Sequence, residues 1–217
     1  NLRLRRRSPA LRSRSARDRR ELREGAMIYY LMGKSASGKD TICRALRKAR
    51  PDWKLLIPYT TRPMRSGERE GAEYHFVSER ELQRLRETGK ILEERSYETE
   101  FGIWRYASVD DGRIGRAGGG DYLLIGTWES YRKLRGRFGG GQLFPLYLEL
   151  PEELRLERAR RREEEQEKPS WAEFWRRFSL DEQDFSEEQL REAGIVRRYR
   201  NLEWEACVNE ILADTAS

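Results

Sequence analysis

Residues 33–41 of this 217-residue chain combine glycine, lysine and hydroxyl side chains at a spacing suited to binding phosphate. The segment reads Gly-Lys-Ser-Ala-Ser-Gly-Lys-Asp-Thr, which contains the complete pattern G-x-x-x-x-G-K. In such a loop, backbone N–H groups at a helix N-terminus surround the phosphate oxygens, and the helix dipole favours their negative charge. Gly33 and Gly38 let the backbone turn close to the phosphates, and Lys39 reaches the outer ones as a mobile positive charge. The sequence therefore predicts a loop that binds the triphosphate of a nucleotide.

The same loop contains the residues expected to bind magnesium. A hydroxyl or carboxylate beside the loop lysine holds Mg²⁺ in sites of this kind, and here Asp40 stands where Ser or Thr is usual, with Thr41 next to it. We expect Asp40 and Thr41 to hold Mg²⁺, with ATP as the phosphoryl donor. The expected ATP contacts within the loop are those of Gly33, Ser35, Ala36, Ser37, Gly38, Lys39, Asp40 and Thr41. The alternative, a glycine-containing turn without a ligand, is disfavoured because the loop lies between a strand-like and a helix-like segment.

A second group of candidate binding residues lies about 25 positions further along the chain. Arg62 and Arg65 are three residues apart around a proline, so both guanidinium groups can face one site, and Tyr74 adds a neutral donor. Paired guanidinium groups bind a dianionic monophosphate with defined geometry as well as charge. These residues therefore predict a site for a phosphorylated acceptor, with surface arginines on a solvated turn as the alternative.

The acceptor segment resembles that of the guanylate kinase family. Residues 60–68 have the form T-T-R-x-x-R-x-G-E, and residues 71–78 have the form G-x-x-Y-x-F-V-S. These two coupled motifs are more specific than a phosphate loop alone, and the resemblance extends over about residues 27–212. It implies that Arg62, Arg65 and Tyr74 hold the phosphate of GMP.

The resemblance also implies roles for residues outside these motifs. Glu93 matches the glutamate that accepts hydrogen bonds from guanine N1 and N2, which adenine cannot donate. Arg158, Arg162 and Arg177 match arginines that cover the migrating phosphoryl group, although surface pairing with nearby glutamates is a strong alternative for them. Asn201 resembles an asparagine close to the adenine of ATP.

The chain departs from the family pattern in four places. Asp40 replaces Ser or Thr, and residues 125–127 read Ile-Gly-Thr where the family has an acidic D-x-D strand end. Phe101 and Ile103 replace a tyrosine and a hydroxyl residue around Gly102, and residues 58–59 lack the serine that assists guanine recognition. We hypothesise that Asp40 replaces the carboxylate lost from the strand end.

Composition and charge limit the other interpretations. The length allows one α/β domain with a small lid, and no apolar stretch reaches membrane-spanning length. The formal net charge is +6, but residues 1–25 hold ten arginines against three acidic residues and leave −1 for the rest of the chain. The chain has only two cysteines, Cys43 and Cys207, too few to suggest a disulfide framework. We expect both to be small core residues of a protein in the reducing cytoplasm.

We expect residues 1–26 to be a disordered, Arg-rich tail. We favour the interpretation that translation begins at Met27. The second alternative is an arm that binds RNA or directs targeting, and the third is a solvated tail. Nucleic-acid binding depends on this tail alone, no membrane partner is indicated, and the sequence sets no oligomeric state.

The expected elements alternate between strand and helix from Met27 onwards. Strands are expected over residues 27–32, 54–59, 72–77, 122–126 and 143–150, and helices over 41–49, 79–88, 129–135, 152–165 and 203–212. Ser78 and Glu81 form a capping box, Gly89 ends that helix, and residues 91–108 suggest short antiparallel strands. The glycines at 139–141 predict a loop, and the aromatic stripe Trp171, Phe174, Trp175 and Phe178 predicts packing against the sheet.

The fold class expected for residues 27–217 is therefore α/β, a three-layer P-loop kinase fold with a parallel five-stranded core sheet. A small antiparallel lobe over about residues 58–108 would bind the nucleoside monophosphate, and residues 155–178 would form a helical lid. The expected reaction is ATP-dependent phosphorylation of GMP or dGMP to GDP or dGDP, as part of purine nucleotide metabolism in the cytoplasm. Two alternatives are a kinase for another phosphorylated acceptor, such as ribose 1,5-bisphosphate, and a non-catalytic guanylate-kinase-like binding module.

Overall fold

The computed structural model describes residues 26–216 with a few internal exceptions. These exceptions are residues 66, 100, 111, 113, 115–119 and 167–168, together with the side chain of Glu173. The expected tail therefore lies outside the described residues except for Ala26, which is buried against the core.

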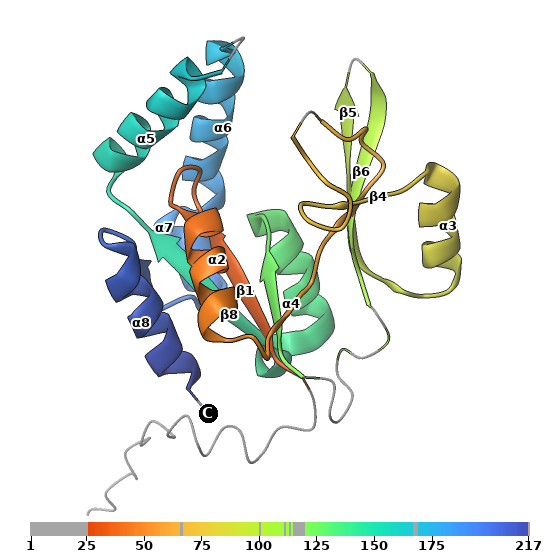
Figure 1. The fold of residues 1–217 in the computed structure, drawn as a ribbon, viewed down its shortest axis with the longest axis horizontal. Helices are drawn as coiled ribbons and strands as arrows, with labels where there is room; N and C mark the ends of the chain where they lie inside the picture. The colour runs from red at the N-terminus through yellow and green to blue at the C-terminus, as the bar shows by residue number, and fades with distance from the viewer. Residues whose placement is uncertain are drawn as a thin grey trace, which may run out of the picture.

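A parallel sheet of five strands forms the centre of the molecule (Figure 1). In spatial order its strands are β2 (Lys54–Leu55), β7 (Tyr122–Ile125), β1 (Ile28–Gly33), β8 (Leu143–Glu149) and β9 (Tyr199–Arg200). Each neighbouring pair is parallel, which confirms the predicted core sheet. The sequence did not indicate β9, whose two residues pair with Leu148 and Glu149.

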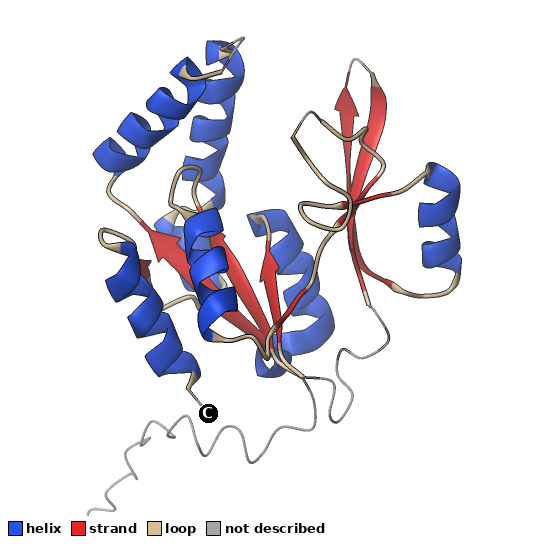
Figure 2. Cartoon of the chain, in the orientation of Figure 1, coloured by secondary structure: helices blue, strands red, loops and turns tan. Residues whose placement is uncertain are grey.

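Strand β1 is buried on both faces because its side chains alternate between two hydrophobic layers. Tyr29 and Leu31 join the layer under α2 (Lys39–Ala49) and α8 (Trp204–Thr215), which contains both predicted core cysteines. Tyr30 and Met32 join the opposite layer, under α4 (Trp128–Gln142) and α7 (Glu187–Glu192). The sheet is thus the middle of three layers, as Figure 2 shows.

A second, smaller sheet forms a separate lobe beside the core. Its order is β4 (His75–Phe76), β3 (Tyr59–Thr60), β6 (Gly102–Val109) and β5 (Ile91–Thr99), and α3 (Glu79–Glu87) covers one face. The predicted β5–β6 hairpin is antiparallel, but β3 and β4 are parallel, so the lobe is mixed rather than purely antiparallel. The segment between β3 and β4 returns through turns closed by Gly71 N–H donating to Tyr74 O and by the Glu70 carboxylate accepting from Phe76 N–H.

The single strand expected over residues 54–59 is instead divided between the two sheets. Leu56 N–H donates to Leu123 O in the core sheet, whereas Pro58 O accepts from His75 N–H in the lobe. Pro58 has no N–H group to continue the ladder, so the chain leaves one sheet and enters the other there.

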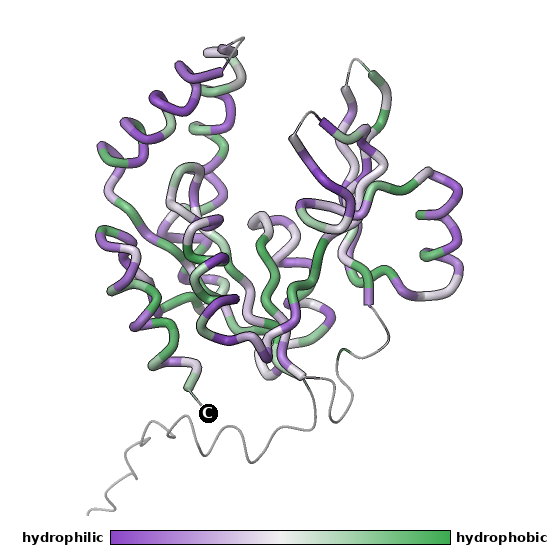
Figure 3. The backbone as a smooth tube through the Cα atoms, viewed as in Figure 1, coloured by the Kyte–Doolittle hydropathy of each residue, from purple (hydrophilic) through white to green (hydrophobic). Residues whose placement is uncertain are grey.

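Helices α5 (Glu152–Glu164) and α6 (Trp171–Asp184) lie side by side and project beyond the core sheet (Figure 1). Figure 3 shows that α5 is mostly hydrophilic, in contrast to the hydrophobic core strands. The prediction that the aromatic stripe packs on the sheet was wrong. Phe174 and Phe178 are buried outside both core layers, with the Arg155 guanidinium 4.7 Å from the Phe178 ring centre, while Trp171 and Trp175 are exposed. The contact between Phe178 and Arg155 joins α6 to α5, so this part of the stripe packs against the neighbouring helix.

Two further differences concern helix boundaries. Helix α4 extends to Gln142, beyond the expected end at Arg135, although Gly139 has a φ of 64° and interrupts its geometry. Helix α7 was not predicted. In the described part of the chain, no helix is both long and apolar enough to cross a membrane.

The capping box at the start of α3 provides a test of the lobe's stability. Ser78 Oγ accepts from Glu81 N–H at 3.2 Å, and the Glu81 carboxylate accepts from Ser78 N–H at 2.8 Å. Ser78→Ala should lower the free energy of unfolding by about 1 kcal/mol, measured by urea denaturation. Ser96→Ala, at an exposed strand position, is the control and should change it by less than about 0.5 kcal/mol. Equal effects would contradict the capping role.

Candidate active site

The phosphate-loop pattern joins the end of β1 to the start of α2, as the sequence predicts. Gly33 is the last residue of β1, and a Cβ atom there would lie 2.6 Å from Leu148 O on the neighbouring strand. Gly38 precedes α2 with a φ of 90°, and a Cβ atom there would overlap the Asn201 amide. Both positions therefore require glycine for close approach, and Gly38 also for its left-handed backbone.

Lys39 begins α2 and turns back over the loop. Its ammonium group donates to Gly33 O at 2.7 Å and to Lys34 O at 3.1 Å. Burial lowers the Lys39 pKa, and the nearby carboxylates of Asp181 and Asp40 partly oppose that shift. The loop thus holds a desolvated cation beside a helix N-terminus, an environment that favours an anion.

Apart from Gly33 and Ser37, the predicted ATP-binding residues line one cavity of about 660 Å³. It is lined by Ser35, Ala36, Gly38, Lys39, Asp40 and Thr41, by Arg158 and Arg162 of α5, and by residues 201–204. Asn201 is buried and its amide donates to Ser37 O at 2.7 Å, so it fixes the loop to the segment before α8. Two arginines and the asparagine, all distant in sequence, therefore lie beside the phosphate loop.

Arg177 lies apart from this group. Its guanidinium is 3.5 Å from the Glu163 carboxylate of α5, and it does not line the donor cavity. Of the three predicted transfer arginines, the structure therefore brings only Arg158 and Arg162 to the loop.

Two acidic residues at the end of α6 contact the loop and were missed from the sequence. Asp181 accepts from Ser35 N–H at 2.6 Å. Glu182 accepts from Lys34 Nζ and from Arg155, both at 2.5 Å. Nothing distinguishes these acids from the many others in the sequence, because only the packing of α6 beside the loop reveals the contacts.

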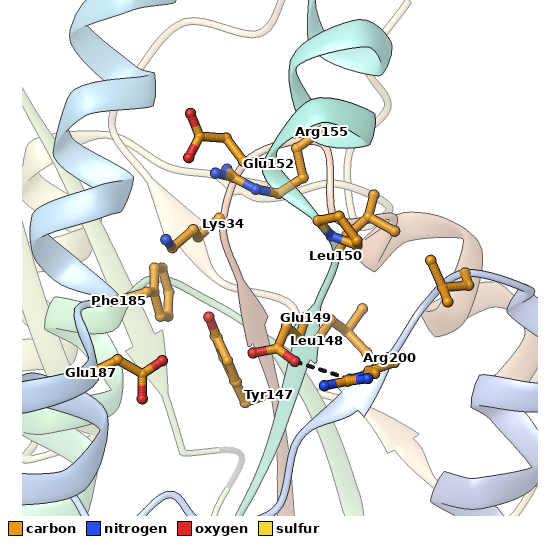
Figure 4. A pocket seen from close by; sticks show the side chains of 12 residues that line it. Lys34, Tyr147, Leu148, Glu149, Leu150, Glu152, Arg155, Phe185, Glu187 and Arg200 are labelled. Atoms are coloured by element: carbon orange, nitrogen blue, oxygen red, sulfur yellow. Dashed lines mark ion pairs between the residues drawn. The ribbon is translucent and has the colours of Figure 1, made fainter.

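A second cavity, of about 360 Å³, is drawn in Figure 4, and Leu202 lines both cavities. Its lining includes Lys34, Arg155 and the Arg200–Glu149 ion pair at 3.4 Å. None of the predicted site residues lines this cavity.

The predicted acceptor residues share one face of the small sheet. Tyr106 on β6 is opposite Thr60 on one side and Arg95 on the other, so alternate residues of these strands lie on the same face. That face carries Thr60, Arg62, Tyr74, Phe76, Glu93, Arg95, Tyr106 and Ser108. The residues between them lie on the other face, where α3 covers Ala107 and Val109. Local strand alternation therefore brings Arg62, Tyr74 and Glu93 together.

The arginine pair is only partly brought together. Arg62 is buried, forms a two-point contact with the Glu68 carboxylate at 2.8 and 3.1 Å, and lies over the Tyr74 ring. Burial raises the Tyr74 pKa and keeps its hydroxyl neutral. Arg65 is exposed, and its backbone N–H donates to Glu68 at 2.7 Å. Glu68 therefore occupies the positions that an anionic group of a ligand would take on Arg62.

Glu93 has an unexpected neighbour. It is buried, with Oε1 accepting from the Ser108 hydroxyl at 2.8 Å and Oε2 lying 3.2 Å from Arg95 Nε. Arg95 was missed, although its position two residues after Glu93 in a predicted strand is a signal that both share a face.

The predicted metal residues Asp40 and Thr41 are exposed on the first turn of α2 and line the donor cavity. Within the described ranges, no three His, Cys, Asp or Glu side chains form a metal cluster. The two side chains nevertheless fit Mg²⁺, which generally keeps several waters and takes one or two protein oxygens together with substrate phosphates.

Comparison with known proteins finds similarity to the same family that the motifs resemble. Residues 26–109 match the family model described as guanylate kinase. Relatives named guanylate kinase include one from Coxiella burnetii, 33% identical over 114 residues (52% of this chain and 53% of the relative). Another, from Thermobifida fusca, is 37% identical over 98 residues (45% and 48%). The chain thus matches about half the length, or less, of these relatives.

The fold has a solved counterpart over most of the chain. A guanylate kinase structure from Anaplasma phagocytophilum matches with a TM-score of 0.59 and 20% sequence identity, covering 88% of this chain and 84% of that one. These similarities confirm the predicted resemblance to the guanylate kinase family and the predicted α/β fold.

The contact between α6 and the loop leads to a pH-dependent prediction. Partial burial opposes ionisation of Glu182, but Lys34 and Arg155 outweigh it and hold its pKa below the ordinary value of 4.5. A lowered carboxyl pKa stabilises the fold above the unfolded value, and this contribution is lost as pH falls through the folded value. Glu182→Gln should therefore lower the urea midpoint at pH 7, and its difference from wild type should shrink below about pH 4.5.

Glu188→Gln, at an exposed position on α7, is the control for that measurement. It should change the midpoint little at either pH. A Glu182→Gln effect that does not vary with pH would contradict the ionic contact.

Proposed function

We propose that this chain, a relative of the guanylate kinases, catalyses ATP-dependent phosphorylation of GMP or dGMP. The observation that carries the proposal is the presence of two complementary sites in one molecule. One is a complete phosphate loop surrounded by cationic side chains, and the other is a sheet face that carries Arg62, Tyr74 and Glu93. A kinase needs both a donor and an acceptor site, whereas a binding module needs only the second.

The donor cavity suits ATP. The loop N–H groups and Lys39 would bind the β- and γ-phosphates, and the positive end of α2 would add to their stabilisation. Arg158 and Arg162, on the same cavity, would neutralise charge that develops on the transferred phosphoryl group. To join them, Arg177 would have to leave its ion pair with Glu163. Asn201 would lie near the adenine.

Asp40 and Thr41 would hold Mg²⁺ with the donor phosphates. When bound, the ion would neutralise negative charge on the phosphates during transfer. The first turn of α2 places both residues directly after Lys39, on the same cavity.

The acceptor face suits a nucleoside monophosphate. Arg62 would exchange the Glu68 carboxylate for the dianionic phosphate of GMP, a stronger partner, with Arg65 and Tyr74 as further donors. Glu93 would accept hydrogen bonds from the guanine edge. The acceptor phosphate is already ionised, so the protein's task is to position it in line with the donor and exclude water.

The two alternative functions are less well supported. A guanylate-kinase-like module that only binds has no use for the loop lysine, Gly38 and two cavity arginines. A bisphosphorylated sugar offers no base edge for Glu93, a buried carboxylate that lies beside Arg95. A cytoplasmic location accords with ATP and GMP as substrates and with the free cysteines Cys43 and Cys207.

The acceptor preference tests the proposal directly. ADP release from ATP and Mg²⁺ should be supported by GMP and dGMP in preference to AMP, UMP and ribose 1,5-bisphosphate. Arg62→Met should raise the KM for GMP by about 10- to 100-fold, because it removes a charged contact to phosphate. Arg86→Met, which removes an arginine on α3, is the matched control and should leave KM unchanged. Turnover of another acceptor alone, or of none, would overturn the proposal.

The magnesium assignment gives a separate prediction. If Asp40 replaces the carboxylate absent from the end of β7, Asp40→Ala should lower kcat more than Thr41→Ala and should raise the Mg²⁺ concentration needed for half-maximal activity. Steady-state kinetics over a magnesium titration measure both effects. Equal, modest losses in the two variants would contradict this role.

A further inference from the structure

Glu93 and Arg95 form a buried pair on the face of the small sheet opposite α3. Their side chains are 0% and 9% exposed, and the Arg95 Nε to Glu93 Oε2 distance is 3.2 Å. Alternation along β5 directs both away from α3, on the same side as Arg62 and Tyr74. A carboxylate acceptor and a guanidinium donor thus lie next to each other in the proposed acceptor site.

Contacts on several elements hold Arg95 in place. Its Nη1 donates to Thr127 Oγ1 at 2.7 Å, beyond the end of β7, and its guanidinium lies 5.9 Å from the Tyr106 ring centre. Thr127 also accepts, through its carbonyl, from the buried Tyr30 hydroxyl at 2.9 Å. A long, flexible side chain is thereby fixed between the lobe and the core sheet.

The Glu93–Arg95 pair leaves part of its hydrogen-bonding capacity unused. Among the residues that the structure describes, Arg95 Nε and Glu93 Oε2 have no hydrogen-bond partner of acceptable geometry, despite their close approach. Buried polar atoms without such partners destabilise a fold, so they need an explanation. Here the two atoms are a donor and an acceptor, and both lie beside residues that would bind the acceptor's phosphate.

We propose that Glu93 and Arg95 together recognise the edge of a 6-oxopurine, with Arg95 donating to O6 while Glu93 accepts from N1–H and the 2-amino group. This inference rests on the proposed GMP site and deepens it. It assigns to Arg95 the contact that residues 58–59, Pro and Tyr, cannot make because they lack the serine noted above.

The pairing predicts discrimination against adenine. With the monophosphate held by Arg62 and Tyr74, the purine has a fixed orientation. Adenine would then direct its amino group at the Arg95 donor and the N1 lone pair at the Glu93 carboxylate. Both contacts would be repulsive, and unpaired buried polar groups give strong rejection.

The competing interpretation is that Arg95 only neutralises and positions Glu93. The two roles can be separated by changing single groups on the ligand. 6-Thio-GMP weakens only the acceptor at position 6, whereas IMP lacks only the 2-amino donor. The preference for GMP over 6-thio-GMP therefore reports on Arg95, and the preference for GMP over IMP reports on Glu93.

The experiment measures dissociation constants of GMP, 6-thio-GMP and IMP by calorimetry on the full chain. Wild type should prefer GMP over 6-thio-GMP by about tenfold. Arg95→Met should reduce that preference to about one while retaining preference over IMP, and Arg95→Lys, which keeps the charge, should show an intermediate value. Arg105→Met removes an arginine from the α3 face of the same sheet, where it pairs with Glu79, and should change neither preference.

The outcomes distinguish the two claims. Loss of the preference over IMP alone, or no change in either preference, would overturn the role of Arg95. If Arg95→Met fails to fold, as judged by circular dichroism, the Arg95→Lys comparison decides. Selective GMP binding without ADP release would overturn the kinase proposal but not the recognition pair. Absence of GMP binding to the wild type would overturn both.

Discussion

The close packing of backbone around the loop after β1 is the constraint on which the rest of the site depends. Gly33 lies against the carbonyl of Leu148, and Gly38 lies against the Asn201 amide, so neither position has room for a side chain. This packing is possible because β1 is central in the sheet and buried on both faces. It fixes the N-terminus of α2, and with it Lys39, relative to the ends of the strands that carry the other site residues.

Local patterns in the sequence predict the features that depend on local geometry. The glycine and lysine spacing identified the loop, and Ser78 with Glu81 identified the start of α3. The β5–β6 hairpin was also predicted, because its aromatic and polar residues alternate along two adjacent segments. In each case the residues that determine the feature are close together in the sequence.

Features that depend on packing between distant segments could not be predicted in this way. Strand β9 has two residues, too few for a period, and exists because it pairs with the end of β8. The same limit applies to Asp181, whose contact with Ser35 spans 146 positions. Phe178 belongs to an aromatic stripe that was detected, but its spacing cannot say whether the partner is a sheet or Arg155 on a neighbouring helix. Periodicity identifies a buried face without identifying what covers it.

The distribution of charge around the loop links helix α6 to the loop's occupant. The end of β7 contributes no carboxylate, since Gly126 and Thr127 stand there and Thr127 binds Arg95. Carboxylates that contact the loop come instead from α6, where Asp181 accepts from Ser35 N–H and Glu182 accepts from Lys34 Nζ. An anion that accepts from Ser35 N–H would compete with Asp181 for that donor, and its negative charge would repel the Asp181 carboxylate. Occupancy of the loop and the position of α6 are therefore thermodynamically coupled, because each alters the free energy of the other.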